Sequence, residues 1–365
     1  MDKLVIFEDS SKVEFGGGQK GTLDVIEVVE KYLEITLFDT NRKSRFQKLT
    51  YNLKKSYLYA YGNQKNIGNS SFSVGITEII FFPILVIINY FKILFFLKFK
   101  KYKNFETVLY TSSKKNLFFL YLLKLSMGYK YIYHARTLDN NKSIWFKILK
   151  IILRKCDLVI CVSESVKKNL DIETGKVLYN TINIPKKANP YHFELDDVFK
   201  IGFVGELLDW KGIDLFGNLS ELFDPNKISF HAYGGGKNLK ELSFRFPKVM
   251  FHDFVKEQDD IFQNINLIIN PSISPESFGR STLEAAAYGI PCISSNFGGQ
   301  RELIQEGKFG ILSNPGDLEE FQKLIEKIYH DEHLYKELSE NGKIYSKKFS
   351  KKNFSKSLIN LISEI

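Results

Sequence analysis

Short apolar runs alternate with amphipathic stretches along this chain, and the alternation continues almost from end to end. Apolar runs rich in β-branched residues are typical of buried strands, and in the first half they occur at Leu4–Phe7, Phe105–Thr111, Lys130–Arg136 and Asp157–Ser163. The segment Lys176–Pro185 closes this half. Stretches such as Gly21–Glu34 have helical spacing, and Ser163 is placed to cap the helix that follows its strand. Strands that alternate with helices predict a parallel, doubly wound α/β sheet.

A second series of the same kind begins after residues 186–198, which are polar and break the pattern as an interdomain linker would. Its strands are expected within Phe199–Leu215, Ile228–Gly236, Lys248–Val255, Asn266–Ser272 and Ile290–Ile304, and a helical tail runs from Leu318 to Ile365. The length of 365 residues also favours two domains. We therefore predict Rossmann-like domains at residues 1–190 and 199–345.

The most apolar segment is Ile79–Lys103. Pro83, Asn89 and Lys92 interrupt it, and a central Lys alone costs about 2.5–3.5 kcal/mol on membrane insertion, so a transmembrane helix is the less favoured interpretation. We expect a helix that is partly packed on its own domain and whose basic end lies at a lipid surface. Lys98, Lys100, Lys101 and Lys103 form this basic end. An ordinary buried helix with a basic end is the alternative.

Charge supports the lipid interpretation. The net charge is +9, but residues 1–190 carry 31 Lys and Arg against 16 Asp and Glu, whereas the rest carries 20 against 26. Such asymmetry suggests that the first domain faces an anionic partner. No nucleic-acid-binding signature accompanies the charge, so a membrane surface is expected and nucleic acid is not.

Cysteine usage and the first residues bear on the compartment. The three cysteines, Cys156, Cys161 and Cys292, show neither metal-ligand spacing nor a disulfide framework. The acidic start of the chain and its short apolar run Leu4–Phe7 do not read as a secretion signal. We expect a cytoplasmic protein, peripheral at the inner face of the cell membrane.

Candidate chemistry concentrates in Pro275–Pro291, where Glu276 and Glu284 bracket a glycine-containing loop and the start of a helix. Unpaired N–H groups at a helix N-terminus favour anions, so a phosphorylated ligand is expected there. In the first half, Gly16–Gly18 follow a strand and allow positive φ or close approach of a ligand, although a plain turn is equally compatible. His134 ends a strand, where open α/β sheets bind ligands, although a lone His is more often structural.

These segments together resemble the GT-B glycosyltransferases, specifically retaining family 4. The resemblance covers nearly the whole chain and is strongest from Ile201 to Pro315. Pro275–Ile304 is similar to the family's Glu–seven residues–Glu signature with its G-x-P and GG-x-x-E elements, and Val204–Gly212 to its strand-turn with a diphosphate-binding Lys. Asp157–Leu170 and Val177–Asn183 resemble first-domain segments. The resemblance implies two Rossmann-like domains facing across a cleft, with a C-terminal helix, about residues 346–365, crossing back to the first.

The resemblance also implies roles for single residues. Glu276 would lie at the reacting face of the donor sugar, His134 would approach the transferred sugar, and Glu284 would accept hydrogen bonds from the ribose. Lys211, at the turn that Gly205 begins, would neutralise the diphosphate. Gly17 and Gly18 would face the donor phosphates, and the base would lie near Phe254 and Val255. The donor's sugar hydroxyls and phosphates would be held by backbone amides in the loop Ser277, Phe278, Gly279, Arg280, Ser281 and Thr282.

Two features complicate this assignment. The family usually has Arg where this chain has Glu206, and a carboxylate there would repel a diphosphate; Arg280 is a candidate to replace the missing charge. Ser281–Glu284 also fits a capping box, in which Glu284 would serve only the helix.

The expected activity is a retaining hexosyl- or N-acetylhexosaminyltransferase that moves a sugar from a nucleotide-diphosphate donor to a lipid-linked or glycan acceptor, as in surface polysaccharide or lipopolysaccharide assembly. The resemblance implies front-face attack, which needs no strong general base, and an enzyme that needs no metal. No Asp-x-Asp pair is placed to bind a metal, so neither a cofactor nor a metal is expected. The alternatives are a catalytically silent GT-B scaffold or partner subunit, and a GT-B sugar-nucleotide epimerase.

Overall fold

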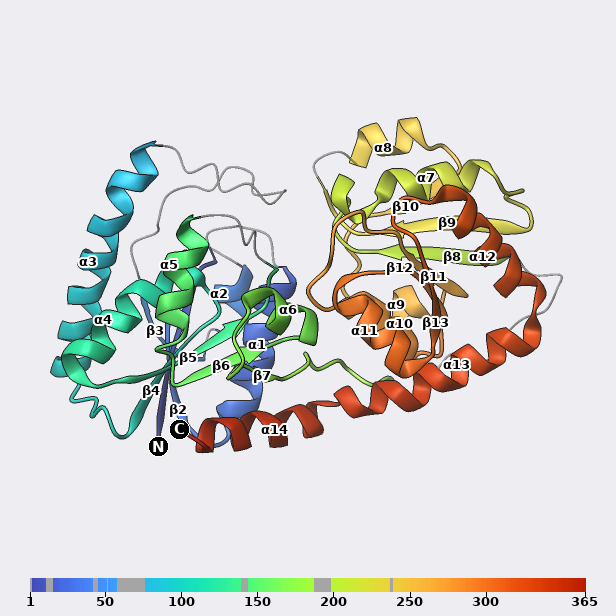
Figure 1. Cartoon of the computed structure of the whole chain (residues 1–365). Helices are drawn as coiled ribbons and strands as arrows, with labels where there is room; N and C mark the ends of the chain where they lie inside the picture. The colour runs from blue at the N-terminus through green and yellow to red at the C-terminus, as the bar shows by residue number, and fades with distance from the viewer. Residues whose placement is uncertain are drawn as a thin grey trace. The chain divides into compact units, whose positions relative to one another are not determined.

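The computed structural model of the chain describes residues 2–10, 16–41, 45–50, 52–57, 76–138, 144–186, 198–236 and 239–365. It divides into two compact units, Met1–Thr181 with Lys351–Ile365 and Ile182–Ser350 (Figure 1). Ile182 belongs to the second unit because its N–H donates to the carbonyl of Phe349 at 3.0 Å and it bridges Ser350. The division therefore precedes the predicted linker, of which residues 187–197 lie outside the described part.

In the first unit, the described strands form one parallel sheet of order β3-β2-β1-β4-β5-β6-β7. The strands are β1 (Lys3–Glu8), β2 (Glu34–Asp39), β3 (Lys54–Tyr57), β4 (Thr107–Thr111), β5 (Lys130–Ala135), β6 (Leu158–Cys161) and β7 (Lys176–Val177). The helices are α1 (Gly17–Val29), α2 (Arg45–Leu49), α3 (Ile76–Phe99), α4 (Leu117–Met127), α5 (Ile144–Leu153), α6 (Glu164–Leu170) and α14 (Lys351–Ser363).

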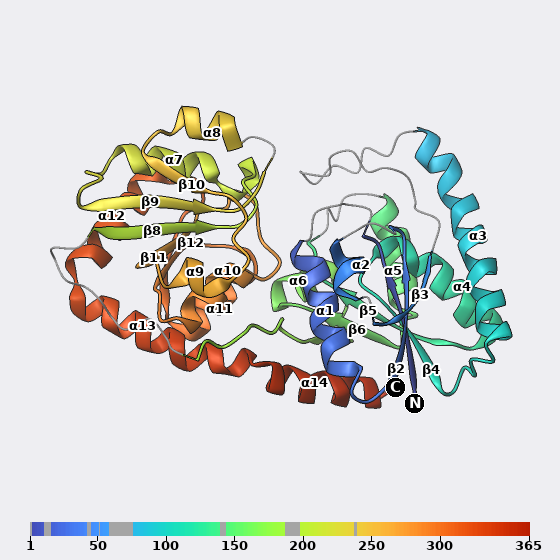
Figure 2. The same ribbon diagram turned by 180° about the vertical axis from the view of Figure 1, so that it is seen from behind.

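Successive side chains of β1 point to opposite faces of this sheet. Leu4 and Ile6 belong to the core that α1 and α14 cover, and from α14 this core takes Phe354, Leu358 and Ile362. On the other face the ring of Phe7 packs against Phe38 and against Phe119 of α4. Figures 1 and 2 show α3 and α4 on one side of the sheet and α1 with α14 on the other.

Helix α3 is only half covered by its own unit. Val86, Asn89, Ile93 and Leu97 are buried, whereas the opposite face exposes Ile84, Ile87, Ile88, Phe91, Phe95 and Phe99. Phe95 is 68% exposed and Phe99 is 83% exposed, so the ordinary buried helix is excluded. By length and composition Phe82–Phe99 also passes as a possible membrane span, with mean hydropathy 1.9 and 22% of the window buried.

The second unit repeats the architecture with a parallel sheet of order β10-β9-β8-β11-β12-β13 among its described strands. The strands are β8 (Phe199–Val204), β9 (Ile228–Tyr233), β10 (Val249–His252), β11 (Leu267–Asn270), β12 (Cys292–Ser295) and β13 (Gly310–Ser313). The helices are α7 (Ile213–Glu221), α8 (Leu239–Arg245), α9 (Gln258–Phe262), α10 (Arg280–Ala287), α11 (Gly298–Gly307), α12 (Leu318–His330) and α13 (Glu332–Ser346).

Helices α7, α8, α12 and α13 share one core with this sheet, which includes Phe216, Phe230 and Ile325. The parallel, doubly wound arrangement predicted from the alternating pattern is confirmed in both units. Ser163 caps α6 as predicted, because its hydroxyl accepts from the N–H of Val166 at 3.1 Å. In the segment Lys176–Pro185, which closes the first half, Lys176 and Val177 form β7 and pair with β6.

Candidate functional site

Lys211 and Glu276 meet at the point where the strand order of the second sheet reverses. β8 and β11 are neighbours in the sheet although they are not consecutive in the chain. Lys211 follows β8 and Glu276 follows β11, so both lie beyond the carboxyl ends of these strands. Open α/β sheets bind ligands in the crevice at this topological switch point.

The two side chains form an ion pair. Lys211 Nζ lies 3.0 Å from Glu276 Oε1, and the side chains are 21% and 10% exposed. Ser272 Oγ lies 2.8 Å from the same carboxylate oxygen and 3.0 Å from Asn270 Oδ1, while Asn270 Nδ2 donates to Thr282 Oγ1 at 3.2 Å. A polar chain therefore runs from Lys211 to the first turn of α10.

Close backbone contacts hold the two loops together. The N–H of Ile273 donates to the carbonyl of Trp210 at 2.8 Å. Gly212 adopts φ +80 and lies so close to the loop after β11 that an added Cβ would be 2.0 Å from the carbonyl oxygen of Pro271. Glycine is thus required beside Lys211 for both conformation and space.

The start of α11 fixes the position of Glu276 from the other side. The N–H of Gly299 donates to the carbonyl of Glu276 at 2.8 Å. Gly298 adopts φ +64, and an added Cβ would lie 2.4 Å from that same carbonyl oxygen. The GG element of the sequence therefore serves as a packing surface for the Glu276 loop.

The loop that leads into α10 differs from the capping-box expectation. Gly279, at φ +88, is the N-cap and Arg280 begins the helix, so Ser281 is already inside it and has no capping bond. The capping box of Ser281–Glu284 is therefore wrong. Leu283 N–H is bonded to Gly279, which leaves the N–H groups of the first turn pointing out of the helix end. Glu284 is buried within α10.

The side chains of this loop divide into two kinds. Phe278 is buried, with its ring 6.3 Å from that of Phe349, and Thr282 is buried in the contact with Asn270. Ser277, Arg280 and Ser281 are half-buried at the surface. The structure therefore brings the predicted loop residues together beside the Lys211–Glu276 pair.

The side chain of Glu206 does not pair with Lys211, the proposed diphosphate-binding residue. Its side chain is exposed, and the carboxylate that pairs with Lys211 belongs to Glu276. Gly205 precedes Glu206 at the end of β8. A Cβ added to Gly205 would lie 3.7 Å from the Lys211 side chain, which is an ordinary contact distance. Water screens an exposed carboxylate, so the expected repulsion of a diphosphate by Glu206 is smaller than the sequence suggested.

Phe254 and Val255 follow β10 at the same edge of the sheet, the first exposed and the second half-buried. Sequence reasoning missed their aromatic neighbours. The rings of Tyr233 and His252 stack at 4.3 Å with an interplanar angle of 7°, and His231 Nδ1 lies 3.1 Å from His252 Nε2. Burial lowers the pKa of His231 to about 4, with the charge of His252 as a further cause, so the pair is neutral at pH 7.

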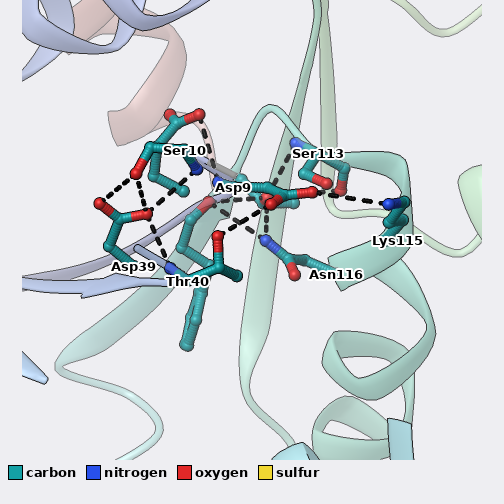
Figure 3. A network of polar contacts seen from close by, with 10 residues as sticks. Asp9, Ser10, Asp39, Thr40, Ser113, Lys115 and Asn116 are labelled. Carbon is teal, nitrogen blue, oxygen red and sulfur yellow. Dashed lines mark hydrogen bonds and ion pairs between the residues drawn. The ribbon is translucent and has the colours of Figure 1, made fainter. Parts of the chain in front are cut away.

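The first unit has its own switch point, between β1 and β4. Figure 3 shows the polar network there, with Ser10 and Asp39 on one side and Lys115 and Asn116 on the other. Buried Asp39 accepts from the hydroxyl and N–H of Ser10, at 2.6 and 3.1 Å. Asp9 accepts from Thr40 Oγ1 at 2.9 Å and lies 3.9 Å from Lys115 Nζ. Much of this network closes the loops after the strands and fixes that edge of the sheet.

His134 ends β5 as predicted, but it is 1% exposed and does not face solvent. Its Nδ1 lies 2.7 Å from the hydroxyl of Tyr110, and among the described residues its Nε2 has no hydrogen-bond partner. Burial and the charge of Arg136 hold the pKa of His134 well below its usual range. No pattern in the sequence pointed to Arg136, which lies beside His134.

Gly17 and Gly18 lie in the first turn of α1 instead of a loop, and their φ values are not positive. That part of the expectation is wrong, because Gly16 already serves as an extended N-cap and the helix starts directly after it. An added Cβ at either glycine would meet nothing within 4 Å, so the surface there is open.

Among the described residues there is no group of three or more His, Cys, Asp or Glu side chains that could hold a metal ion.

Residues 187–345 match the family model described as glycosyl transferases group 1. This part of the chain is similar to the glycosyl transferases of group 1. Both the Lys211–Glu276 pair and the α10 loop lie within it. The finer assignment to family 4 stays a prediction.

The chain is similar to curated proteins of archaea and bacteria, among them the following two. An uncharacterized glycosyltransferase of Methanocaldococcus jannaschii is 34% identical over 209 residues, which cover 53% of this chain and 56% of that protein. The capsular polysaccharide biosynthesis glycosyltransferase CapM of Staphylococcus aureus is 28% identical over 167 residues, covering 43% and 44%. The chain thus spans about half the length of these relatives.

The fold comparison extends over the whole chain. The crystal structure of Anabaena HepE in complex with UDP matches with a TM-score of 0.77 at 18% identity and covers 100% of both chains. The predicted GT-B fold is confirmed by this likeness and by the two Rossmann-like units.

Proposed function

We propose that the chain is a retaining glycosyltransferase that binds a nucleotide-diphosphate sugar at the β8–β11 switch point of the second unit. The observation that carries the proposal is the Lys211–Glu276 pair beside the first turn of α10. A diphosphate needs cationic and N–H partners, and a sugar needs a carboxylate to accept from its hydroxyls. The site places these partners within one polar chain.

The chemistry follows from charge development. Breaking the sugar–phosphate bond leaves negative charge on the diphosphate and oxocarbenium character on the sugar. Lys211 and the N–H groups at the start of α10 stabilise the diphosphate. Glu276, oriented by Ser272, accepts from the sugar or stabilises its cationic character. Lys211 exchanges its contact with Glu276 for the diphosphate when the donor binds.

Donor binding is tested first by thermal shift with UDP, GDP, ADP and CMP, because a bound ligand raises Tm by mass action. UDP is the first candidate, since the HepE structure holds UDP. Lys211→Gln should abolish the shift, and Lys227→Gln, an exposed lysine of the same unit, should retain it. No shift with any nucleoside diphosphate, or equal shifts in both variants, would refute the site.

Catalysis is tested with the matching nucleotide sugars and acceptor extracts. Transfer with retention of the anomeric configuration supports the proposal. Binding without transfer or hydrolysis would support the silent scaffold instead, and isomerised donor without an acceptor would support an epimerase. The exposure of Glu206 argues against a silent protein, because its charge is open to water screening.

Helix α3 carries the surface that we relate to a membrane-associated acceptor. Its exposed apolar face continues into Phe105, which is 71% exposed, and the basic residues Lys98, Lys100, Lys101 and Lys103 are exposed at the same end. We propose that this surface docks on anionic lipid, with each Lys contributing about 1 kcal/mol, at the inner face of the membrane. CapM is named for capsular polysaccharide biosynthesis, which fits a lipid-linked or glycan acceptor.

Flotation with anionic and neutral liposomes at low salt tests the docking surface. The variant with Phe91, Phe95 and Phe99 changed to Ser should lose anionic vesicle binding. The control is Phe244→Ser on α8 of the second unit, where Phe244 is 91% exposed, and it should bind as the unchanged protein does. Binding that the triple variant retains would refute the surface.

A further inference from the structure

The carboxyl ends of β1, β4 and β5 hold a hydrogen-bond network centred on Arg136, which is half-buried. Its guanidinium donates to the carbonyl of Gly18, to Thr22 Oγ1 at 3.1 Å and to the hydroxyl of Tyr110 at 2.8 Å. Thr22 in turn donates to Glu8 Oε2 at 2.6 Å. Arg136 thus joins the start of α1 to the strand ends around His134.

The direction of these hydrogen bonds fixes the position of the imidazole proton. Arginine has donors and no acceptor, so the Tyr110 oxygen accepts from Arg136. The described residues offer the Tyr110 hydrogen one acceptor, His134 Nδ1 at 2.7 Å. Arg136 Nη2 also faces Nδ1 at 3.4 Å, which disfavours a proton there. Nδ1 is therefore the acceptor, and the proton of the neutral ring lies on Nε2.

The charges around the ring act in the same direction. Arg136 is the cation next to His134, and Thr22 links it to Glu8, whose pKa burial raises to about 7. Burial raises the pKa of Tyr110 and of Cys161 on the adjacent β6 to about 12 in each case, so both are neutral. Burial and Arg136 lower the pKa of His134, which keeps the ring uncharged.

We propose that Arg136 is a positioning residue that, through Tyr110, holds His134 as the neutral tautomer protonated on Nε2. His134 then offers the transfer reaction a hydrogen-bond donor and never a general base. Because Nε2 is buried without a partner among the described residues, the group that matches it is a hydrogen-bond acceptor such as an oxygen. This use of the donor rests on the proposed function; the tautomer does not.

NMR of the full chain with ¹⁵N-labelled histidine tests the tautomer without any substrate. The chain has six histidines, and His134→Gln identifies the signal of His134 by its loss. We expect the Nε2–H pattern, unchanged between about pH 6 and 8, as for a ring whose pKa lies below that range. An Nδ1–H pattern, or a protonated ring at pH 7, overturns the proposal.

Variants separate positioning from mere packing. Arg136→Gln should raise the pKa of His134 and mix its tautomers, whereas Arg136→Lys, which keeps the charge, should hold the ring neutral. Arg154→Gln, an exposed change at the end of α5, should leave the His134 signal unchanged. Equal His134 spectra in all three variants would overturn the role of Arg136. If Arg136→Gln does not fold, the measurement on the unchanged protein still decides the tautomer.

Kinetics connect the network to the reaction. Arg136→Gln should lower kcat about tenfold, as for the loss of one hydrogen bond, and should add an acid limb to the pH profile that Arg154→Gln lacks. A pH profile equal to that of the unchanged enzyme would overturn the catalytic part. Absence of transfer in the unchanged protein would refute the proposed function and leave the NMR result standing.

Discussion

Gly298→Ala offers a sharp test of how the Glu276 loop is held. Gly298 adopts φ +64, and its Cβ position lies 2.4 Å from the carbonyl oxygen of Glu276 and 2.9 Å from the Glu276 nitrogen. Ordinary contact begins near 3.4 Å. The added methyl must therefore push α11 and the loop apart by about 1 Å, because neither neighbour is a flexible side chain.

Two effects follow, and they differ in size. Positive φ costs an alanine about 1–2 kcal/mol of stability. A shift of about 1 Å in a carboxylate that orients the sugar can cost about 100-fold in rate, since catalytic groups must be held in reacting geometry. We therefore expect a modest loss of stability and a large loss of kcat.

Gly316→Ala is the matched control. Gly316 lies in the same unit at φ +80, but an added Cβ there meets nothing within 4 Å. Gly316→Ala should lose only the stability that positive φ costs in urea unfolding, and Gly298→Ala should lose more because of the backbone clash; only Gly298→Ala should lose transfer activity. Equal kinetics for the two alanine variants would refute the idea that close packing of α11 positions Glu276.

Three further predictions follow from other parts of the chain. Arg280→Ala should weaken binding of a nucleoside diphosphate about tenfold by calorimetry, as for a lost charge-assisted hydrogen bond; a change no larger than that of an average surface variant would mean that Arg280 does not replace a missing cation. Leu358→Ala in α14 should cost about 2–5 kcal/mol in the first unit, since Leu358 is fully buried, whereas the exposed control Lys356→Ala should cost almost nothing; hydrogen exchange locates the loss. Burial raises the pKa of Glu8 to about 7 from an ordinary value of 4.5, so the folded state binds this proton more tightly and the first unit should lose stability as pH rises from about 4.5 to 7. Glu8→Gln should remove that slope in urea titrations at pH 5 and 7.5; a slope that persists would contradict the burial argument.

Much of the fold could be predicted because parallel strands buried on both faces leave a strong signal. Runs such as Leu4–Phe7 and Asn266–Ser272 are apolar and β-branched, and both lie at strands of the structure, β1 and β11. Shorter elements such as β13 were missed, since Gly310–Ser313 is half-exposed and begins with glycine. Helix α10 starts at Arg280, before the predicted cap, because Gly279 can adopt a left-handed conformation that needs no side-chain cap.

The candidate site was predicted unevenly for the same physical reason. Lys211 and Glu276 lie in turns after strands, and topology alone brings the ends of β8 and β11 together. Their direct pairing at 3.0 Å was not predicted, since the sequence does not show which of Glu206 and Glu276 turns toward Lys211. The local sequence pattern shows where these residues lie along the chain. The direction in which each side chain points is set by the packing of the loops and is seen only in the structure.

Arg136 marks the clearest limit of pattern reasoning. An arginine directly after a strand looks like a solvated end, yet it lies under α1 and bonds to Gly18, Thr22 and Tyr110. An arginine in that position needs acceptors for its donors, because a charge shielded from water without partners is costly. Helix α1 and strand β4 supply acceptors for the two Nη atoms, whereas Nε has no partner among the described residues. Only the three-dimensional arrangement brings these two segments to Arg136. The same arrangement makes His134 a buried neutral donor, so the chemistry of the histidine depends on residues that no local sequence motif connects to it.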